Sequence, residues 1–278
     1  MNRVTLPRLG DRLTLGSSGL QVSPFCVGMV GQPDTVLAAY DAGINFFFLT
    51  ADMHWPLYEA TRRGLGLLLA RGGDIRDRIV VATTSYVTQP EFCFMPHREV
   101  LDAMPGLDRI DVLVAGGAYA PEIDRRAEIY AEHRVQSFAG ARAIGASFHD
   151  RAAAAHHACA GIFDICFVRY NAAHPGAETD LFPHVGKRSA RLFNFKNLMG
   201  HVSPRRCAEL GLGEDLWRPD ITDGYRFALT PPQMDGLLIA PAVPAHVDAL
   251  VHALGKGPLQ DEEREFMRSL SLLDQGLA

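Results

Sequence analysis

Eight short apolar runs recur along the chain, and most of them are followed by a stretch with a helical pattern. The runs do not alternate between apolar and polar residues, which is typical of parallel strands that are buried on both faces. Eight such strands alternating with helices predict an α/β fold, the (β/α)8 or TIM barrel. The runs span residues 25–29, 44–49, 79–82, 110–115, 141–146, 162–168, 191–195 and 236–239.

The stretches between these runs carry the start and stop signals of helices. Asp34 follows Pro33 and Gly43 stops the same stretch, while Asp150 is a candidate N-cap for an alanine-rich helix. The predicted helices span residues 34–42, 57–70, 98–104, 121–133, 152–160, 245–254 and 261–278.

The first residues differ from the rest of the chain. Two short apolar segments, 4–6 and 13–15, flank Gly10 and Asp11, and a Gly-Ser-Ser-Gly turn follows at 16–19. This pattern predicts a β-hairpin ahead of the first barrel strand. The length of 278 residues suits one barrel, so residues 1–278 are predicted to form a single domain.

Charge and apolar content exclude several classes of protein. The 32 acidic residues outnumber the 27 basic ones, which gives no electrostatic reason to expect nucleic acid or an anionic membrane as partner. No apolar run approaches the length of about 18 residues that spans a bilayer, and no apolar segment of a secretory signal follows the first residues. We therefore expect a cytoplasmic protein that binds a small molecule.

The five cysteines are odd in number and scattered, which indicates reduced thiols rather than a disulfide framework. His156 and Cys159 have the i, i+3 spacing that places two metal ligands on one helix face. The same helix supplies no third ligand at a suitable spacing, so no metal site is expected.

Three stretches together resemble the aldo-keto reductase superfamily. They are LGSSGLQVSPFCVGMVG at 15–31, DAGINFFFLTADMHW at 41–55 and FVRYNAAHPGAETDLFPHV at 167–185. Segments 143–150 and 230–239 fit the same order, so the resemblance covers nearly the whole chain. It implies a (β/α)8 barrel that transfers hydride between NADPH and a carbonyl through an Asp, Tyr, Lys and His tetrad.

The four tetrad positions of that family are all changed here. They fall on Leu49, His54, Thr84 and Gly116 in place of Asp, Tyr, Lys and His. In the family, the Lys and Asp lower the pKa of the catalytic Tyr, which donates a proton to the carbonyl oxygen. This chain lacks all three residues at those positions, although the imidazole of His54 can donate a proton instead. Glycine at 116 either opens the pocket to a bulkier ligand or lets a loop fold in.

The cofactor positions implied by the resemblance are also partly lost. Ser147 matches the family's serine and Phe195 its stacking aromatic, but Phe148 and Phe167 replace the Asn and Gln that hold the nicotinamide amide. Residues 239–250 contain no Lys or Arg for the 2′-phosphate of NADPH. This disfavours NADPH and leaves NADH open, because NADH lacks that phosphate.

Catalytic side chains of such barrels lie at the carboxyl ends of the strands. There His54 is the candidate acid or base, and Lys196 could hold an anionic substrate or form a Schiff base. Tyr86 and Tyr119 are candidate hydrogen-bond donors, and Asp52 follows the second barrel strand. Each of these roles has a structural alternative. Lys196 could be a surface cation, the two tyrosines could pack at the rim, and His54 could be a hydrogen-bonded residue of the pocket wall.

Three functions follow from this reasoning, in order of preference. The first is a non-redox enzyme on an aldo-keto reductase scaffold, an isomerase, dehydratase, cyclase or lyase acting on a small metabolite in specialised biosynthesis. The second is an oxidoreductase with a rebuilt NAD(P)H-dependent site. The third is a non-catalytic binding subunit.

Overall fold

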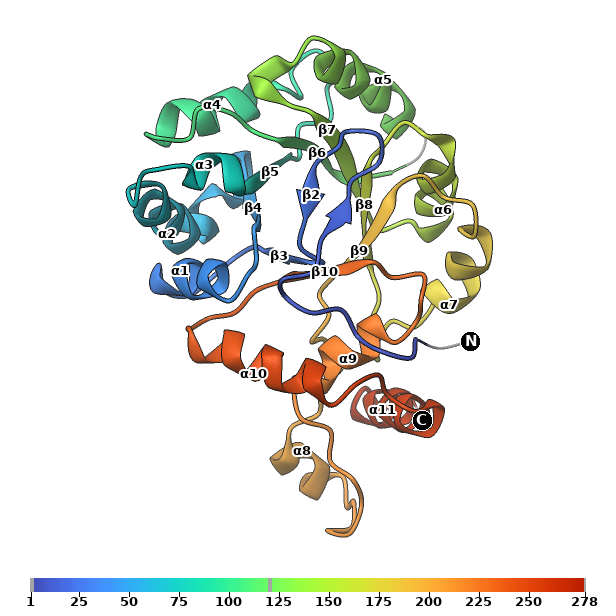
Figure 1. The fold of residues 1–278 in the computed structure, drawn as a ribbon. Helices are drawn as coiled ribbons and strands as arrows, with labels where there is room; N and C mark the ends of the chain where they lie inside the picture. Colours follow the sequence, from blue (N-terminus) through green and yellow to red (C-terminus); the bar gives the residue numbers. More distant parts are fainter. Residues whose placement is uncertain (1–2, 120–121, 278) are drawn as a thin grey trace.

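A closed barrel of eight parallel strands forms the centre of the computed structural model, which describes residues 3–119 and 122–277 (Figure 1). The strands follow the cyclic order β10-β3-β4-β5-β6-β7-β8-β9, and each predicted apolar run overlaps one of them. The TIM-barrel prediction is therefore confirmed. The strands are β3 (Phe25–Val27), β4 (Phe46–Thr50), β5 (Val80–Ser85), β6 (Val112–Ala118), β7 (Ala143–Phe148), β8 (Ile165–Arg169), β9 (Arg191–Phe195) and β10 (Gly236–Ile239).

Helices surround the barrel, and all seven predicted helices overlap a helix of the structure. The start of one of them, Pro121, lies outside the described residues. Asp150 is the N-cap of α6, because its carboxylate accepts hydrogen bonds from the N–H groups of Ala152 and Ala153. The α-helices are α1 (Asp34–Asp41), α2 (Glu59–Leu69), α3 (Ile75–Arg78), α4 (Met95–Ala103), α5 (Glu122–Val135), α6 (Arg151–Ala160), α7 (Ala177–Asp180), α8 (Pro204–Glu209), α9 (Asp223–Leu229), α10 (Ala245–Gly255) and α11 (Asp261–Asp274). The 3₁₀ helices are η1 (Asp52–Tyr58), η2 (Phe138–Gly140) and η3 (Phe182–His184).

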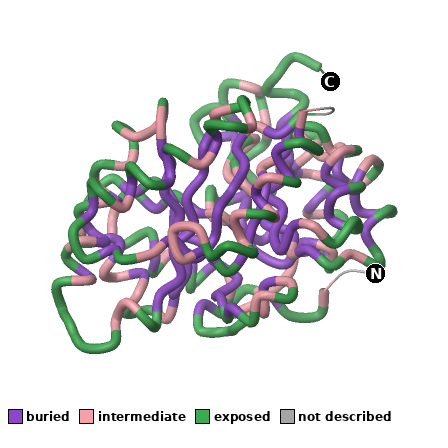
Figure 2. Tube along the Cα trace, turned by 90° about the horizontal axis from the view of Figure 1, so that it is seen from above, coloured by how far each residue is buried: buried purple, intermediate pink, exposed green. Residues whose placement is uncertain are grey.

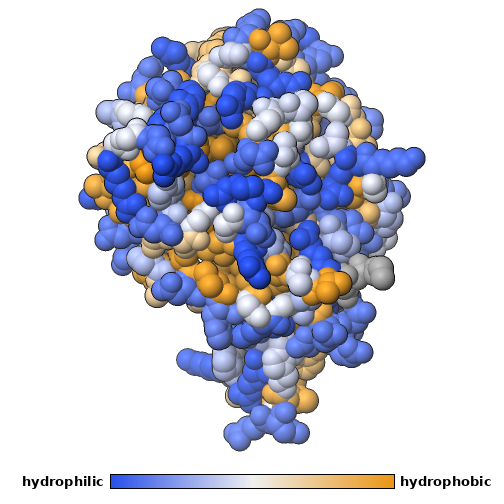
Figure 3. Space-filling view, in the orientation of Figure 1, coloured by the Kyte–Doolittle hydropathy of each residue, from blue (hydrophilic) through white to orange (hydrophobic). Residues whose placement is uncertain are grey.

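The N-terminal hairpin exists, but its predicted arms are partly wrong. β1 (Leu13–Thr14) pairs with β2 (Gln21–Val22) around the 16–19 turn, whereas residues 4–6 form no strand. The turn folds back because Leu15 and Leu20, together with β2, pack into the amino-terminal end of the barrel. The hairpin closes that end in Figure 1, and hydrophilic residues gather over it in Figure 3.

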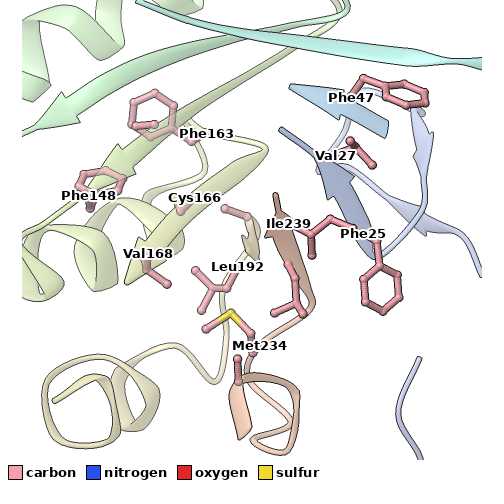
Figure 4. Packing of buried hydrophobic residues seen from close by; sticks show 14 of the residues in the cluster. Phe25, Val27, Phe47, Phe148, Phe163, Cys166, Val168, Leu192, Met234 and Ile239 are labelled. Carbon is pink, nitrogen blue, oxygen red and sulfur yellow. The ribbon is translucent and has the colours of Figure 1, made fainter. Parts of the chain in front are cut away.

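Alternate strand residues face two different apolar layers. Those inside the barrel pack on one another, as Phe46 does on Phe193 at 5.8 Å between ring centroids. Those outside pack under the helices, as Phe148, Phe163 and Val168 do in Figure 4. Figure 2 shows the resulting buried centre with exposed residues at the periphery. Both layers hold the strand ends in fixed positions.

Four buried polar side chains fasten the strands at the amino-terminal end. Each stands just before one strand and accepts a hydrogen bond from a backbone N–H at the start of the neighbouring strand. The pairs are Asn45 with Ser23 at 2.7 Å, Asp111 with Val81 at 2.8 Å, Asp164 with Ile144 at 3.0 Å and Asp235 with Leu192 at 2.8 Å. The strands so anchored alternate around the barrel, so the device recurs with fourfold pseudo-symmetry.

The C-terminal helix α11 is fastened to the barrel by a half-buried carboxylate. Glu178 accepts hydrogen bonds from the hydroxyl of Tyr170, at the end of β8, and from Arg264 and Arg268 on α11. Arg264 also donates to the Tyr170 hydroxyl at 2.8 Å. Glu178 and Tyr170, part of the resembling stretch at 167–185, are thus structural.

Candidate functional site

A cavity of about 650 Å³ opens at the carboxyl ends of the strands, opposite the hairpin. Five of the seven residues singled out in the sequence line it, namely His54, Tyr86, Ser147, Phe195 and Lys196. They come from the ends of β4, β5, β7 and β9, which are far apart in sequence. The barrel therefore gathers the candidate residues at the end where such sites form.

His54 and Tyr86 form one wall of this cavity. Their ring centroids lie 4.7 Å apart with the ring planes tilted by 57°. His54 Nδ1 is buried and has no hydrogen-bond partner among the described residues. A buried ring nitrogen without a partner costs free energy of about 1–3 kcal/mol. Because Nδ1 is buried, a ligand in the cavity would meet the partly exposed remainder of the His54 ring.

Asp52 lies outside the cavity and supports its wall. Its carboxylate accepts hydrogen bonds from the Ser85 hydroxyl at 3.0 Å and from the Tyr86 N–H at 2.7 Å. Its backbone has a φ of 54°, which is uncommon for a residue other than glycine. We assign Asp52 the role of positioning Tyr86 rather than of touching a ligand.

Gly116 does not widen the cavity. A Cβ added there would lie 2.8 Å from Thr84 Oγ1 and 2.9 Å from Tyr86 Cδ1. The position is therefore crowded at the Cβ by Thr84 of β5 and by Tyr86, and Gly116 is not among the residues that line the cavity. This disfavours the wider pocket, while the inward-folded loop stays a prediction.

Lys196 follows β9 and lines the cavity with an exposed side chain. Its φ of 57° lies in the left-handed region. The side-chain amide of Asn171 donates a 2.8 Å hydrogen bond to its carbonyl oxygen, which helps to hold this conformation. The backbone conformation thus fixes the direction in which the Lys196 side chain leaves the main chain.

Tyr119 does not line the cavity. Its ring is 53% exposed and stacks on His149 with centroids 6.3 Å apart. His149 itself lines the cavity and also packs edge-on against Phe195 at 5.5 Å. Tyr119 therefore acts on the cavity only through His149.

Tyr58 is a cavity residue that sequence reasoning missed. It lines the cavity beside Gly28, since a Cβ on that glycine would lie 3.5 Å from the Tyr58 hydroxyl. Burial raises the pKa of Tyr58 well above its usual range, so the phenol keeps its proton. Its position four residues after His54, one helical turn away, was the available signal, but the residue was assigned to a predicted helix.

The positions matched to the family's tetrad are not arranged as four facing groups. Leu49 packs in the outer apolar layer, while its neighbours Phe48 and Thr50 line the cavity. The hydroxyl of Thr84 is buried and has no hydrogen-bond partner among the described residues. No carboxylate lines the cavity within the described chain.

The nicotinamide end of a dinucleotide fits the site only in part. The Ser147 hydroxyl, which accepts a hydrogen bond from the Gly117 N–H at 3.0 Å, remains able to donate into the cavity, and Phe195 offers a stacking face. Phe148 points into the outer layer and supplies no amide. After β10, His246 in the first turn of α10 accepts a hydrogen bond at Nδ1 from the Ala242 N–H at 3.2 Å. The residues present do not fit the 2′-phosphate of NADPH.

Residues 3–119 and 122–277 contain neither a cluster of metal-ligating side chains nor a membrane-spanning helix. No group of three or more His, Cys, Asp or Glu side chains is gathered there to hold a metal ion. No helix in those ranges has the length and apolar character needed to cross a bilayer. Cys159 is exposed and the other four cysteines are buried, all as free thiols.

Comparisons with known proteins show that the chain is similar in fold to aldo-keto reductases of known structure. No protein-family model matches the chain, and no curated protein matches it. Aldo-keto reductase AKR11C1 from Bacillus halodurans, in its holo form, has a TM-score of 0.68 at 20% identity, covering 94% of this chain and 96% of that one. PA4992 from Pseudomonas aeruginosa, proposed to be an aldo-keto reductase, has a TM-score of 0.67 at 18% identity, covering 91% and 99%. At these identities the likeness shows the shared barrel fold.

Proposed function

We propose that this chain is a divergent aldo-keto-reductase-like enzyme that carries out acid–base chemistry without hydride transfer on a small metabolite. Isomerisation, dehydration, cyclisation and elimination are the reaction types that suit the site, with specialised biosynthesis as the setting. The observation that carries the proposal is the His54 imidazole, which packs against the Tyr86 ring and lines a cavity that has no carboxylate among its described lining residues.

The chemistry follows from the groups at the wall. An imidazole is the side chain best matched to accept and return a proton near neutral pH. The phenols of Tyr58 and Tyr86, whose pKa values burial raises, stay protonated and can donate hydrogen bonds to a substrate oxygen. His54 would move the proton while the two phenols orient the substrate and stabilise charge that develops on its oxygen.

The loss of cofactor contacts supports a reaction without a nicotinamide. The segment 239–250 carries no cation for the 2′-phosphate, and Phe148 faces away from the cavity. The positions matched to the catalytic tetrad and those matched to the cofactor contacts thus both differ from the aldo-keto reductase pattern. A difference at one of the two sets is compatible with altered substrate specificity. Differences at both sets favour a different reaction.

A second candidate is an NADH-dependent oxidoreductase with a rebuilt site. It is favoured by Ser147 and Phe195, which both line the cavity and match the serine and stacking aromatic of the family. The structural neighbours with the same fold are described as reductases. NADH has no 2′-phosphate, so the missing cations do not count against it.

Fluorescence titration of the protein with NADH and NADPH separates the two candidates. The proposal expects no saturable binding of either nucleotide at micromolar concentrations. In parallel, small oxo and hydroxy acids are incubated with the protein in D2O and followed by NMR for cofactor-free turnover or deuterium uptake.

In that assay His54→Gln is expected to lower the rate at least about 100-fold, the usual range for a general acid or base. The matched variant His252→Gln alters an exposed histidine on α10 and should keep the full rate. Tight NADPH binding with NADPH-dependent turnover would overturn the proposal, and the same result with NADH alone would establish the second candidate.

A further inference from the structure

Two cationic side chains, Arg169 and Lys196, and the imidazole of His149 lie on one side of the cavity mouth. Lys196 and His149 line the cavity, and Arg169 ends β8 directly beside Phe195 of β9 in the strand register. Arg169 and Lys196 both act electrostatically on His149 and His174, and they lower the pKa of each imidazole further than burial alone does. Basic groups from three strand ends thus share one region.

These cations lack the partners that other cations of the barrel have. Neither Arg169 nor Lys196 takes part in an ion pair or donates a side-chain hydrogen bond within the described residues. By contrast, Arg188 and Arg191 at the opposite end share Asp235 at 3.0 and 3.2 Å. Like charges held together without a counter-charge repel one another, and an anion bound between them relieves that repulsion.

The backbone is strained where it presents Lys196. Lys196 is one of four non-glycine residues with positive φ in the described chain, and it lines the cavity. Asp52, another of the four, lies outside the cavity and positions Tyr86. Strained backbone of this kind is concentrated at ligand sites, where it sets the direction of a side chain. Lys196 is therefore placed at the mouth at a cost in stability.

The rest of the cavity suits an apolar body. Phe48, Phe167, Leu198 and Leu238 line it, and no carboxylate of the described chain does. In the barrel order β8 lies directly across from β4, so Arg169 and the segment that carries His54 stand on opposite sides of the mouth. A ligand that spans the cavity therefore meets a basic side, an apolar middle and the His54 wall.

On the basis of the proposed function, we infer that Arg169, Lys196 and His149 form an oxyanion subsite. It holds the carboxylate or phosphate group of an otherwise apolar substrate and directs the reacting centre of that substrate toward His54. The substrate class is thus a small organic acid or phosphate monoester with a hydrophobic body.

Isothermal titration calorimetry with defined probes tests this inference. The probes are 3-phenylpropionate, phenyl phosphate and inorganic phosphate, with 3-phenylpropionamide as the neutral match of the first. Saturable binding of at least one aromatic anion is expected, and the amide should bind at least about tenfold more weakly, as expected when a charged hydrogen bond is lost. Whether the carboxylate or the phosphate ester binds more tightly identifies the acid group.

The variants Arg169→Ala and Lys196→Ala should each weaken the binding of that anion about tenfold or more, with unchanged circular dichroism. Lys187→Ala, in the basic loop at the other end of the barrel, should leave it unchanged. The test measures binding without turnover, so a failure of the acid–base proposal leaves it intact. The inference is overturned if the amide binds as tightly as the acid, if neither aromatic anion binds at millimolar concentration, or if Arg169→Ala and Lys196→Ala have no effect.

Discussion

The Asp52 carboxylate lies 2.7 Å from the amide nitrogen of Tyr86 and accepts its hydrogen bond, so the segment after β4 fixes the segment after β5. The same carboxylate accepts from Ser85. Asp52→Ala should therefore lower the free energy of unfolding by about 1–3 kcal/mol, since these two donors and the N–H of Met53 lose a charged acceptor. It should also release the Tyr86 ring from the cavity wall.

Urea denaturation measures the first effect and the NMR signals of the Tyr86 ring measure the second. Asp52→Asn, which keeps an acceptor oxygen, should fall between the wild type and the alanine variant. Asp248→Ala on the exposed face of α10 is the control and should change stability by less than about 0.5 kcal/mol. An unchanged Tyr86 signal in Asp52→Ala would contradict the positioning role.

Gly116 offers a test of packing at the mouth. A methyl group there would lie 2.8–2.9 Å from Thr84 and Tyr86, so Gly116→Ala should destabilise the protein by about 1–3 kcal/mol through overpacking. Gly66→Ala is the matched change, because Gly66 lies within helix α2 with no atom within 4 Å of the added methyl group. It should stabilise by about 0.5–1 kcal/mol. Thermal denaturation of both variants measures the two effects. Equal melting temperatures for the two variants would contradict the close packing around Gly116.

The strain at Lys196 predicts an order of stability. Lys196→Gly should be more stable than Lys196→Ala by about 1 kcal/mol, because glycine adopts a φ of 57° without a steric cost. At Lys256, where φ is −72°, the order should reverse. Urea denaturation of the four variants provides the comparison. If alanine is preferred at both positions, Lys196 is not strained.

His97 makes stability depend on pH. It is fully buried between the Thr83 hydroxyl and the Tyr130 hydroxyl, and burial lowers its pKa to about 3. The unfolded chain takes up this proton near pH 6.5 but the folded protein does not. The free energy of unfolding should therefore be unaffected by His97 above pH 6.5 and fall by up to about 1.4 kcal/mol per pH unit between pH 6.5 and 3.

Urea denaturation from pH 7.5 to 4.5 measures this slope. His97→Asn should be less stable than the wild type at pH 7.5, because the hydrogen bonds to Thr83 and Tyr130 are weakened, but its stability should fall less steeply on acidification. The difference between the two slopes isolates His97 from the other histidines. Identical slopes would show that His97 does not resist protonation.

The sequence predicted the barrel because its strands are continuous apolar runs, whose burial on two faces leaves a strong pattern. It misjudged the hairpin, because two-residue strands such as Gln21–Val22 carry almost no pattern, and their place depends on the barrel end that they close. The short helices α3, α7, α8 and α9 were not predicted, because one or two helical turns have too few residues for a period to appear.

The candidate site was predicted in outline through the rule that strand ends carry function. Sequence order placed His54 and Lys196 at strand ends, and both line the cavity. It could not show that Tyr86 fills the space beside Gly116, because this depends on where a loop turns. Nor could it separate Tyr119, which only stacks on His149, from Tyr58, whose hydroxyl lies beside the cavity wall.

The side chains that fasten the strands, exemplified by Asp164 and Asp235, all lie at the end of the barrel that carries no candidate catalytic residue. Strand register is therefore set at one end while ligand chemistry is set at the other. Substitutions at the mouth can accumulate over evolutionary time without disturbing how the strands meet. A barrel built this way separates the contacts that fix its strands from the residues of the candidate site, and the barrel fold is recognisable at 20% identity.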